Sequence, residues 1–241
     1  MNKLKSILLG VLAILTYFIF NKFAALPFVI FNIDVNQLPD IIKHIYSIII
    51  DLLIIIVIYT LFKDTINNNL KDIKKNHLTY FKTYIKYWFI ALGLMMFSNL
   101  IIMIFTDSNI ANNEQSIRTL FKDDPIFIFI QAVILAPIIE ELVFRQAFRN
   151  IFSNNIIFIL ASGIVFGSMH VFTSYNSLTD LLYIIPYSIP GIIFAYTLVK
   201  SKNIFVPMGL HFIHNGLLLS LQFVTLIFGW FKWKRKFLFI F

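Results

Sequence analysis

Long apolar stretches, separated by short polar segments, recur along almost the whole chain. Such stretches are long enough to cross the hydrocarbon core of a bilayer as helices. They are solid rather than alternating, which favours helices over the strands of a membrane barrel. The candidate spans are Ser6–Phe20, Ile45–Phe62, Tyr87–Phe105, Ile126–Phe148, Ile156–Phe172, Leu181–Val199 and Ile204–Phe231. The pattern predicts an all-α, polytopic transmembrane helix bundle of about seven to eight spans.

The first and last apolar runs each have a second interpretation. The first is short and follows Lys3 and Lys5, as in a signal peptide. However, Phe23-Ala24-Ala25 is a poor cleavage site, so an uncleaved first helix is preferred. The last run is long for one helix and short for two. A broken or re-entrant pair is therefore the alternative to a single span there.

Composition agrees with a membrane protein. Of 241 residues, 59% are hydrophobic and only 13% are charged, about half the charged share of a soluble domain. This excludes a soluble enzyme and a disordered chain. The absence of Cys excludes disulfides, thiolate zinc sites and a Cys nucleophile. The net charge of +8 fits basic loops facing anionic lipid headgroups, so membrane lipids are expected as partners and nucleic acid is not.

The distribution of basic residues predicts the orientation of the chain. The polar segment after the second run is rich in lysine: Lys63, Lys71, Lys74, Lys75 and Lys82. The segment after the third run has only Arg118 and Lys122 against four acidic residues. Because cytoplasmic loops carry the excess of Lys and Arg, the N-terminus is predicted to be cytoplasmic in a multi-pass protein of the cell membrane. Seven spans would then place the basic tail outside, a conflict that the broken last run would remove.

Charged side chains inside apolar runs are rare in this chain and therefore informative. Burying one costs about 2.5–3.5 kcal/mol on insertion scales, so a functional role is the default interpretation. Glu140 and Glu141 are adjacent and follow Pro137 closely. Glu141 and Arg145 are spaced to pair on one helix face, while Glu140 points about 100° away, toward another partner. The alternative is a helix end at the membrane surface with all three residues solvated.

Histidines and an amide occur in two later runs. His170 follows Phe166 by one helical turn, and alone it is explained most simply as a hydrogen-bonded histidine near the surface. His211 and Asn215 share a helix face, and His214 lies nearby. Two histidines and an asparagine so close together in an apolar run are hard to explain by packing. These residues are therefore candidates for chemistry.

Glu140, His170, His211 and Asn215 together suit hydrolysis by water. A carboxylate and a histidine can hold and deprotonate a water molecule, and a second histidine with an amide can stabilise an oxyanion. Glu140, His170 and His211 are equally a ligand set for catalytic zinc with an open position. The chain has no H-E-x-x-H motif, so such a zinc site would have to be assembled across helices.

At this point the chain resembles a known family, the CPBP family. These are the CAAX-protease and bacteriocin-processing intramembrane proteases, also called the Abi family. The resemblance covers about residues 125 to 230 and is carried by three motifs in order. They are E-E-x-x-x-R (Glu140, Glu141, Arg145), F-x-x-x-H (Phe166, His170) and H-x-x-x-N (His211, Asn215).

The resemblance implies a role for each motif residue in a membrane cavity that opens toward the cytosol. Glu140 and His170 would activate the attacking water, and His211 with Asn215 would form the oxyanion site. Glu141 and Arg145 would support the geometry, and Phe166 would line the pocket. His214 has no role in these motifs. The family fits a zinc-dependent or a glutamate-dependent protease, and both stay open here.

The resemblance also divides the chain and implies a substrate class. Residues 1–124 would be N-terminal transmembrane helices, 125–230 the CPBP-like catalytic core, and 231–241 a basic aromatic tail. The substrates would be membrane-associated proteins or peptides, in CAAX-type cleavage, peptide processing or self-immunity to bacteriocins. The alternatives are a non-catalytic scaffold or regulator of the same family and a proton-coupled transporter. The transporter is less favoured because matched broken helices in the two halves are not evident.

Overall fold

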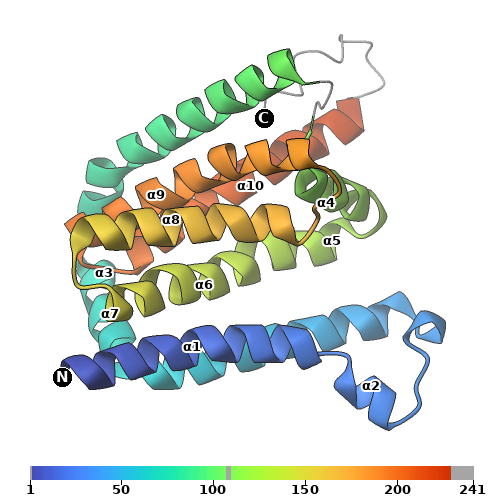
Figure 1. The fold of residues 1–241 in the computed structure, drawn as a ribbon, viewed down its shortest axis with the longest axis horizontal. Coiled ribbons are helices and arrows are strands. Elements are labelled where there is room, and N and C mark those ends of the chain that lie inside the picture. The colour runs from blue at the N-terminus through green and yellow to red at the C-terminus, as the bar shows by residue number, and fades with distance from the viewer. Residues whose placement is uncertain (1, 107–109, 229–241) are drawn as a thin grey trace.

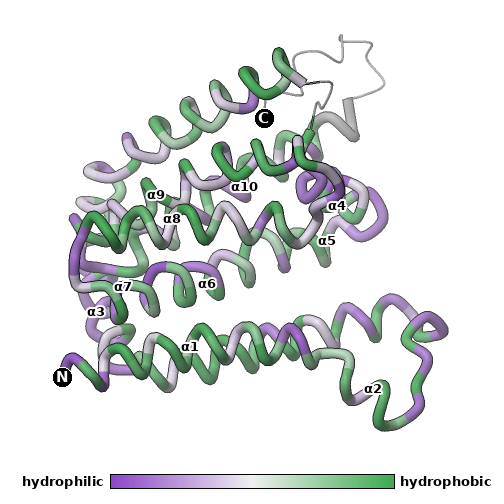
Figure 2. The backbone as a smooth tube through the Cα atoms, in the orientation of Figure 1, coloured by the Kyte–Doolittle hydropathy of each residue, from purple (hydrophilic) through white to green (hydrophobic). Residues whose placement is uncertain are grey.

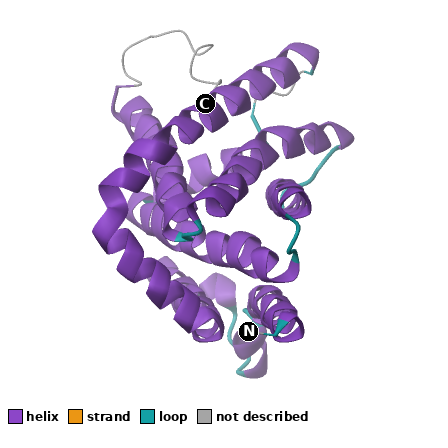
Figure 3. Ribbon diagram, turned by 90° about the vertical axis from the view of Figure 1, so that its left-hand side faces the viewer, coloured by secondary structure: helices purple, strands orange, loops and turns teal. Residues whose placement is uncertain are grey.

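The computed structural model describes residues 2–106 and 110–228, and within those ranges it contains helices and no strand, as Figures 1 and 3 show. The predicted all-α membrane bundle is confirmed. The long elements are α1 (Lys3–Phe23), α3 (Asp40–Phe105), α8 (Asn155–Phe172), α9 (Ile184–Ser201) and α10 (Phe205–Phe228). The short elements are α2 (Leu26–Ile30), η1 (Val35–Gln37), α4 (Asn112–Asp123), α5 (Pro125–Ile128), η2 (Phe129–Leu135), α6 (Ala136–Glu140), η3 (Glu141–Ala147), α7 (Phe148–Ile151) and η4 (Leu178–Tyr183).

Five helical stretches of the described chain are long and apolar enough to cross a membrane, judged by length and composition. One of them, Pro125–Ile151, joins α5 to α7 into a single stretch. Large apolar side chains cover the outside of the bundle, and Phe105 and Ile126 are 81% and 78% exposed. Figure 2 shows the green, apolar colouring along the helices and purple, polar segments mostly at their ends. This surface suits contact with lipid.

The polar segment expected as a loop between the second and third spans is helical instead. Helix α3 runs for 66 residues and contains both predicted runs, Ile45–Phe62 and Tyr87–Phe105. Phe62 has non-helical backbone angles, φ −115° and ψ 17°, so the helix bends at the end of the first run. The lysine-rich stretch that follows contains neither Pro nor Gly to end a helix. The sequence prediction was therefore wrong about the loop but right about the two apolar runs.

The lysine-rich middle of α3 is fastened to the turn between α9 and α10. Asn203, which is only 1% exposed, donates to the carbonyl oxygen of Asn69 at 2.9 Å and to Asp72 Oδ2 at 2.8 Å. The side chain of Asn69 in turn accepts from the backbone N–H of Ile204 at 2.8 Å. We call these three bonds the Asn203 latch. They hold one end of the bundle together across a long sequence separation.

Helices α8 and α9 form the closest pair at the centre of the bundle. Gly163 and Gly167 of α8 face α9, and a Cβ added at either position would lie 2.6 Å from the backbone nitrogen of Ile192 or Ser188. Small residues at such contacts allow two membrane helices to approach closely. The close approach fixes Phe166, which lies between the two glycines in sequence and is 3% exposed. The core thus sets the position of one predicted motif.

Helix α4 lies across the opposite end of the bundle from the lysine-rich middle of α3 (Figure 1). It is joined to the loop before η4 and to η4, because Asn112 Nδ2 donates to the carbonyl of Ser174 at 3.2 Å and to Asp180 Oδ2 at 3.0 Å. It is also joined to α10, where Gln222 Nε2 donates to Glu114 Oε1 at 2.6 Å. One end of the molecule is thus rich in lysine, and the other is capped by α4.

Candidate active site

Glu141 connects two of the predicted motifs. Its Oε2 lies 3.2 Å from Nε of Arg145, and both side chains are 0% exposed. Its Oε1 accepts a hydrogen bond from Nδ1 of His211 on α10 at 2.9 Å. The expected Glu141–Arg145 pair is confirmed. The contact with His211 is an addition, and it means that one carboxylate both neutralises a buried guanidinium and fixes the orientation of an imidazole.

Glu140 faces the other nitrogen of the same imidazole. Its Oε2 lies 3.6 Å from Nε2 of His211 and has no hydrogen-bond partner among the described residues. The carboxylates of two adjacent glutamates therefore face the two ring nitrogens of a single histidine. Figure 1 shows the helical stretch through α6 running beside α8, with α9 above α8 in this view. The distance from Glu140 to His211 is longer than a direct hydrogen bond.

A turn of π-helix begins at Glu141 and continues to Ala147, so the residues of the first motif lie where the helix widens. Such turns occur frequently at functional sites in helices. All seven residues of this turn are buried. Glu141, the first residue of this turn, contacts both Arg145 and His211.

Aromatic rings hold Arg145 from the side opposite to Glu141. The guanidinium carbon lies 4.4 Å from the ring centre of Phe166 and 5.9 Å from that of Phe194. A cation over the face of an aromatic ring is stabilised by the ring's quadrupole, more strongly where water is excluded. Phe166 was expected to line the pocket, and it does so while also supporting Arg145.

His170 occupies a separate position on the far side of Phe166. Its Nδ1 lies 3.0 Å from the carbonyl oxygen of Phe166, and its ring stacks on Tyr187 with centres 4.9 Å apart. A carbonyl oxygen only accepts, so Nδ1 carries the hydrogen and Nε2 of the neutral ring is an acceptor. His170 makes no ion pair with Glu140 in the described structure. The joint role of Glu140 and His170 in activating water therefore stays a prediction.

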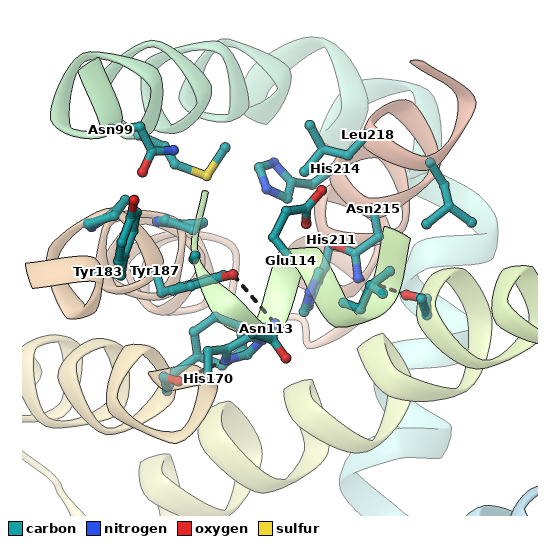
Figure 4. Close-up of a pocket in the computed structure, with 18 of the residues that line it drawn as sticks. Asn99, Asn113, Glu114, His170, Tyr183, Tyr187, His211, His214, Asn215 and Leu218 are labelled. Carbon is teal, nitrogen blue, oxygen red and sulfur yellow. Dashed lines mark hydrogen bonds between the residues drawn. The ribbon is translucent and has the colours of Figure 1, made fainter. Parts of the chain in front are cut away.

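A pocket with about 130 Å³ of space for water joins these groups. It is lined by His170, His211, His214 and Asn215 and is closed in part by α4. Figure 4 shows the α10 side chains His211, His214 and Asn215 on one side of the view and His170 with Tyr187 on the other. Asn215 donates one amide hydrogen to the carbonyl of Ala132 at 2.7 Å. Glu140 is not part of the lining and meets the pocket through His211.

Three pocket residues were not singled out from the sequence. Phe194 supports Arg145, Tyr187 stacks on His170, and Glu114 reaches the pocket from α4. Glu114 is one of the four acidic residues in the polar segment after the third apolar run. An aromatic residue in an apolar run carries no signal that separates a pocket wall from a lipid contact. These positions could therefore be found only from the packing of the helices.

The described side chains do not converge as a metal site. Within residues 2–106 and 110–228, no group of three His, Asp or Glu side chains is placed to hold a metal ion. Glu140 and His211 lie close together, but the ring of His170 is stacked on Tyr187 and bound to a backbone carbonyl. The expected zinc set of Glu140, His170 and His211 does not fit this geometry, and no step below depends on a metal.

Comparison with known proteins places this site in a family context. Residues 122–217 match the family model described as type II CAAX prenyl endopeptidase Rce1-like. The chain is 27% identical over 115 residues to the putative membrane peptidase YdiL of Bacillus subtilis (strain 168), covering 46% of this chain and 43% of that protein. It is 29% identical over 140 residues to the membrane-embedded CAAX protease MroQ of Staphylococcus aureus (strain USA300), covering 54% and 53%.

The matched region contains every motif residue described above. The chain matches these curated relatives over about half of their length. No solved structure gives a significant match. The family model and the relatives agree with the three motifs found in the sequence. The part of the chain that carries them, residues 122–217, is similar to the Rce1-like family of type II CAAX prenyl endopeptidases.

Proposed function

We propose that the protein is an intramembrane endopeptidase that hydrolyses peptide bonds of membrane-associated proteins or peptides. One observation carries the proposal. Two adjacent glutamates face the two ring nitrogens of His211, and His211 lines a pocket. Buried charges in a membrane bundle are expensive and mark functional sites by default. A structural role would be served by the Glu141–Arg145 pair alone and would not require Glu140.

The attacking water is proposed to bind between Glu140 and His211. The 3.6 Å separation of Glu140 Oε2 and His211 Nε2 is longer than a direct hydrogen bond, so both groups keep the capacity to bind a water molecule. Glu141 holds the hydrogen of His211 on Nδ1, which leaves Nε2 free to accept from the water. Glu140 then takes the proton as general base when the water oxygen attacks the carbonyl carbon.

His170 and Asn215 complete the proposed site from two sides. The acceptor nitrogen Nε2 of His170 can bind a hydrogen of the water or of the substrate amide. Asn215 has a second amide hydrogen beyond the one bound to Ala132, and this hydrogen can donate to the carbonyl oxygen of the substrate. This arrangement moves His211 from the oxyanion role, implied by the resemblance, to the water.

The substrate class follows from the relatives and from the position of the site. The matched family model describes a CAAX prenyl endopeptidase, so a farnesylated CAAX peptide is the first probe. The apolar surroundings of the pocket suit membrane peptides without a prenyl group equally well, as expected in peptide processing or bacteriocin self-immunity. The two probes separate these substrate classes.

The test compares the wild-type protein with Glu140→Gln in detergent micelles. Both are incubated with an internally quenched farnesylated CAAX peptide and with a library of unmodified quenched peptides. Wild type is expected to cleave at least one probe, and Glu140→Gln is expected to lower kcat by about 10²–10⁴-fold because the general base is lost. Asp64→Asn, the same carboxylate-to-amide change at an exposed position of α3, is the matched control and keeps wild-type activity.

Two results would overturn the proposal. A wild-type protein that inserts and remains folded but cleaves none of the probes would favour the non-catalytic scaffold. Full activity in Glu140→Gln would remove the proposed base. A parallel assay with a chelator, followed by zinc addition, tests the zinc alternative directly: loss of activity that zinc restores would mean that the side chains rearrange to bind metal.

A further inference from the structure

The motif side chains that line this pocket offer few hydrogen-bond donors to a substrate carbonyl. Both nitrogens of His211 face carboxylates, at 2.9 Å from Glu141 and 3.6 Å from Glu140. The hydrogen of His170 is directed to the carbonyl of Phe166. Asn215 has already given one amide hydrogen to Ala132. Among the motif residues that line the pocket, one amide hydrogen of Asn215 therefore remains as a donor, and two donors are usual in an oxyanion site.

His214 is the remaining histidine in the pocket wall, and it lies outside the three motifs. Its side chain is 6% exposed, and its ring meets the ring of Phe194 edge to face with centres 6.4 Å apart. Nδ1 is buried and has no hydrogen-bond partner in the described part of the chain. Nε2 is not enclosed in this way, and the ring lines the pocket. The two nitrogens of His214 therefore have different surroundings.

These surroundings decide which nitrogen carries the hydrogen. A buried N–H without an acceptor is rare in native structures and costs about 1–3 kcal/mol. Placing the hydrogen on Nε2 avoids that cost, because Nε2 can bind water or substrate in the pocket. A positive charge on the ring is also disfavoured, because the pocket wall is largely apolar. His214 is thus a neutral ring that presents an N–H donor to the pocket.

We propose that the Nε2–H of His214 and the remaining amide hydrogen of Asn215 bind the oxygen of the scissile carbonyl. The proposal rests on the proposed endopeptidase function. When the water oxygen attacks the carbonyl carbon, the electron pair of the C=O bond moves to the oxygen, and these two donors stabilise its charge. The proton of the water passes to Glu140 and then to the leaving amine as the C–N bond breaks. His214 neither gains nor loses a proton.

A packing role for His214 makes a different prediction. A histidine retained only to fill space would be replaced by leucine without loss of catalysis. A donor role predicts a dependence on where the replacement places its N–H group. Glutamine carries its amide nitrogen at about the reach of Nε2, whereas asparagine carries it at about the reach of Nδ1. Comparing the activity of His214→Gln with that of His214→Asn therefore shows which ring nitrogen of His214 acts as the donor.

The experiment measures kcat and KM of four variants with the probe that wild type cleaves. His214→Leu and His214→Asn are expected to lower kcat by about 10²–10³-fold, the loss typical of one oxyanion donor, with KM nearly unchanged. His214→Gln should recover a large part of kcat. His77→Leu, the same change at an exposed position of α3, is the matched control and keeps wild-type values.

A second readout does not depend on turnover. In protein labelled with 15N-histidine, the ring nitrogens of His214, assigned by their loss in His214→Leu, should show the Nε2–H tautomer. Wild-type kcat in a folded His214→Leu variant, or an Nδ1–H tautomer, would overturn the donor role while leaving the endopeptidase intact. A wild-type protein that cleaves no probe would end the proposed function, and the role of His214 with it.

Discussion

At the scale of single residues, Arg145 is a fully buried cation with several fixed contacts. It is 0% exposed and is held by one carboxylate and two aromatic rings. Glu141, its partner, also orients His211. A buried ion pair adds little net stability when both partners are present, but removing one of them leaves the other charge buried alone. The guanidinium is therefore needed for the fold and, through Glu141, for the site.

Arg145→Met is expected to lower the free energy of unfolding by about 3–5 kcal/mol, because it leaves Glu141 as an unpaired buried charge. Unfolding by SDS titration in mixed micelles measures the change. Lys74→Met, at an exposed position of α3, serves as the control for removing a long cation. A loss below about 1 kcal/mol, the value typical of a surface pair, would show that Arg145 is solvated.

At the scale of elements, two features set the site: the π-helical turn of η3 and the close contact of α8 with α9. The first gives Glu141 its two partners, Arg145 and His211. The second fixes Phe166 and His170, which follow Gly163 on α8. The two helices are packed without spare space at this contact, because a methyl group on Gly163 would clash with the backbone of Ile192. The position of His170 thus depends on a residue that takes no part in the chemistry.

Gly163→Ala is expected to destabilise the protein by about 1–3 kcal/mol, the range typical of overpacking, and to lower kcat by displacing His170. Gly93→Ala is the matched control, since a Cβ at Gly93 meets nothing within 4 Å. Stability and peptide cleavage are measured on both variants. Equal behaviour of the two would mean that α8 and α9 can separate without affecting the site.

At the scale of the whole molecule, the two ends differ in charge and in function. The lysine-rich middle of α3 lies at one end, and α4 covers the pocket at the other (Figures 1 and 2). The positive-inside rule places the lysine-rich end in the cytoplasm, and hence the α4 end outside. The family resemblance implies a cavity that opens toward the cytosol. These two expectations disagree, and the side of α4 decides between them.

The chain contains no Cys, so single cysteines can report the orientation without background. Lys74→Cys in α3 and Gln115→Cys in α4 are both at exposed positions. With a maleimide that does not cross membranes, the lysine distribution predicts labelling of Gln115→Cys and protection of Lys74→Cys in intact cells. The reverse pattern would favour the cytosolic opening. Labelling of both variants in lysed cells is the control for accessibility.

The sequence predicted most of the site because charge is scarce in this chain. Glu140, Glu141, Arg145 and His211 could be selected as functional, since few other ionisable residues lie in apolar runs. The contact between Glu141 and His211 could not be predicted, because it depends on the π-helical turn and on the packing of α10. The continuity of α3 was missed because a polar, lysine-rich segment resembles a loop whenever neighbouring runs are assumed to need one.

The Asn203 latch has a consequence in time. Its partners are separated by 131 to 135 positions along the chain. At about 5–20 residues per second during synthesis, Asn69 emerges roughly 7–27 s before the turn that binds it. During this interval the middle of α3 lacks the three hydrogen bonds of the latch. His211 is made still later, so the candidate site can assemble only after this part of α10 has been made, and the proposed proteolysis cannot begin before then.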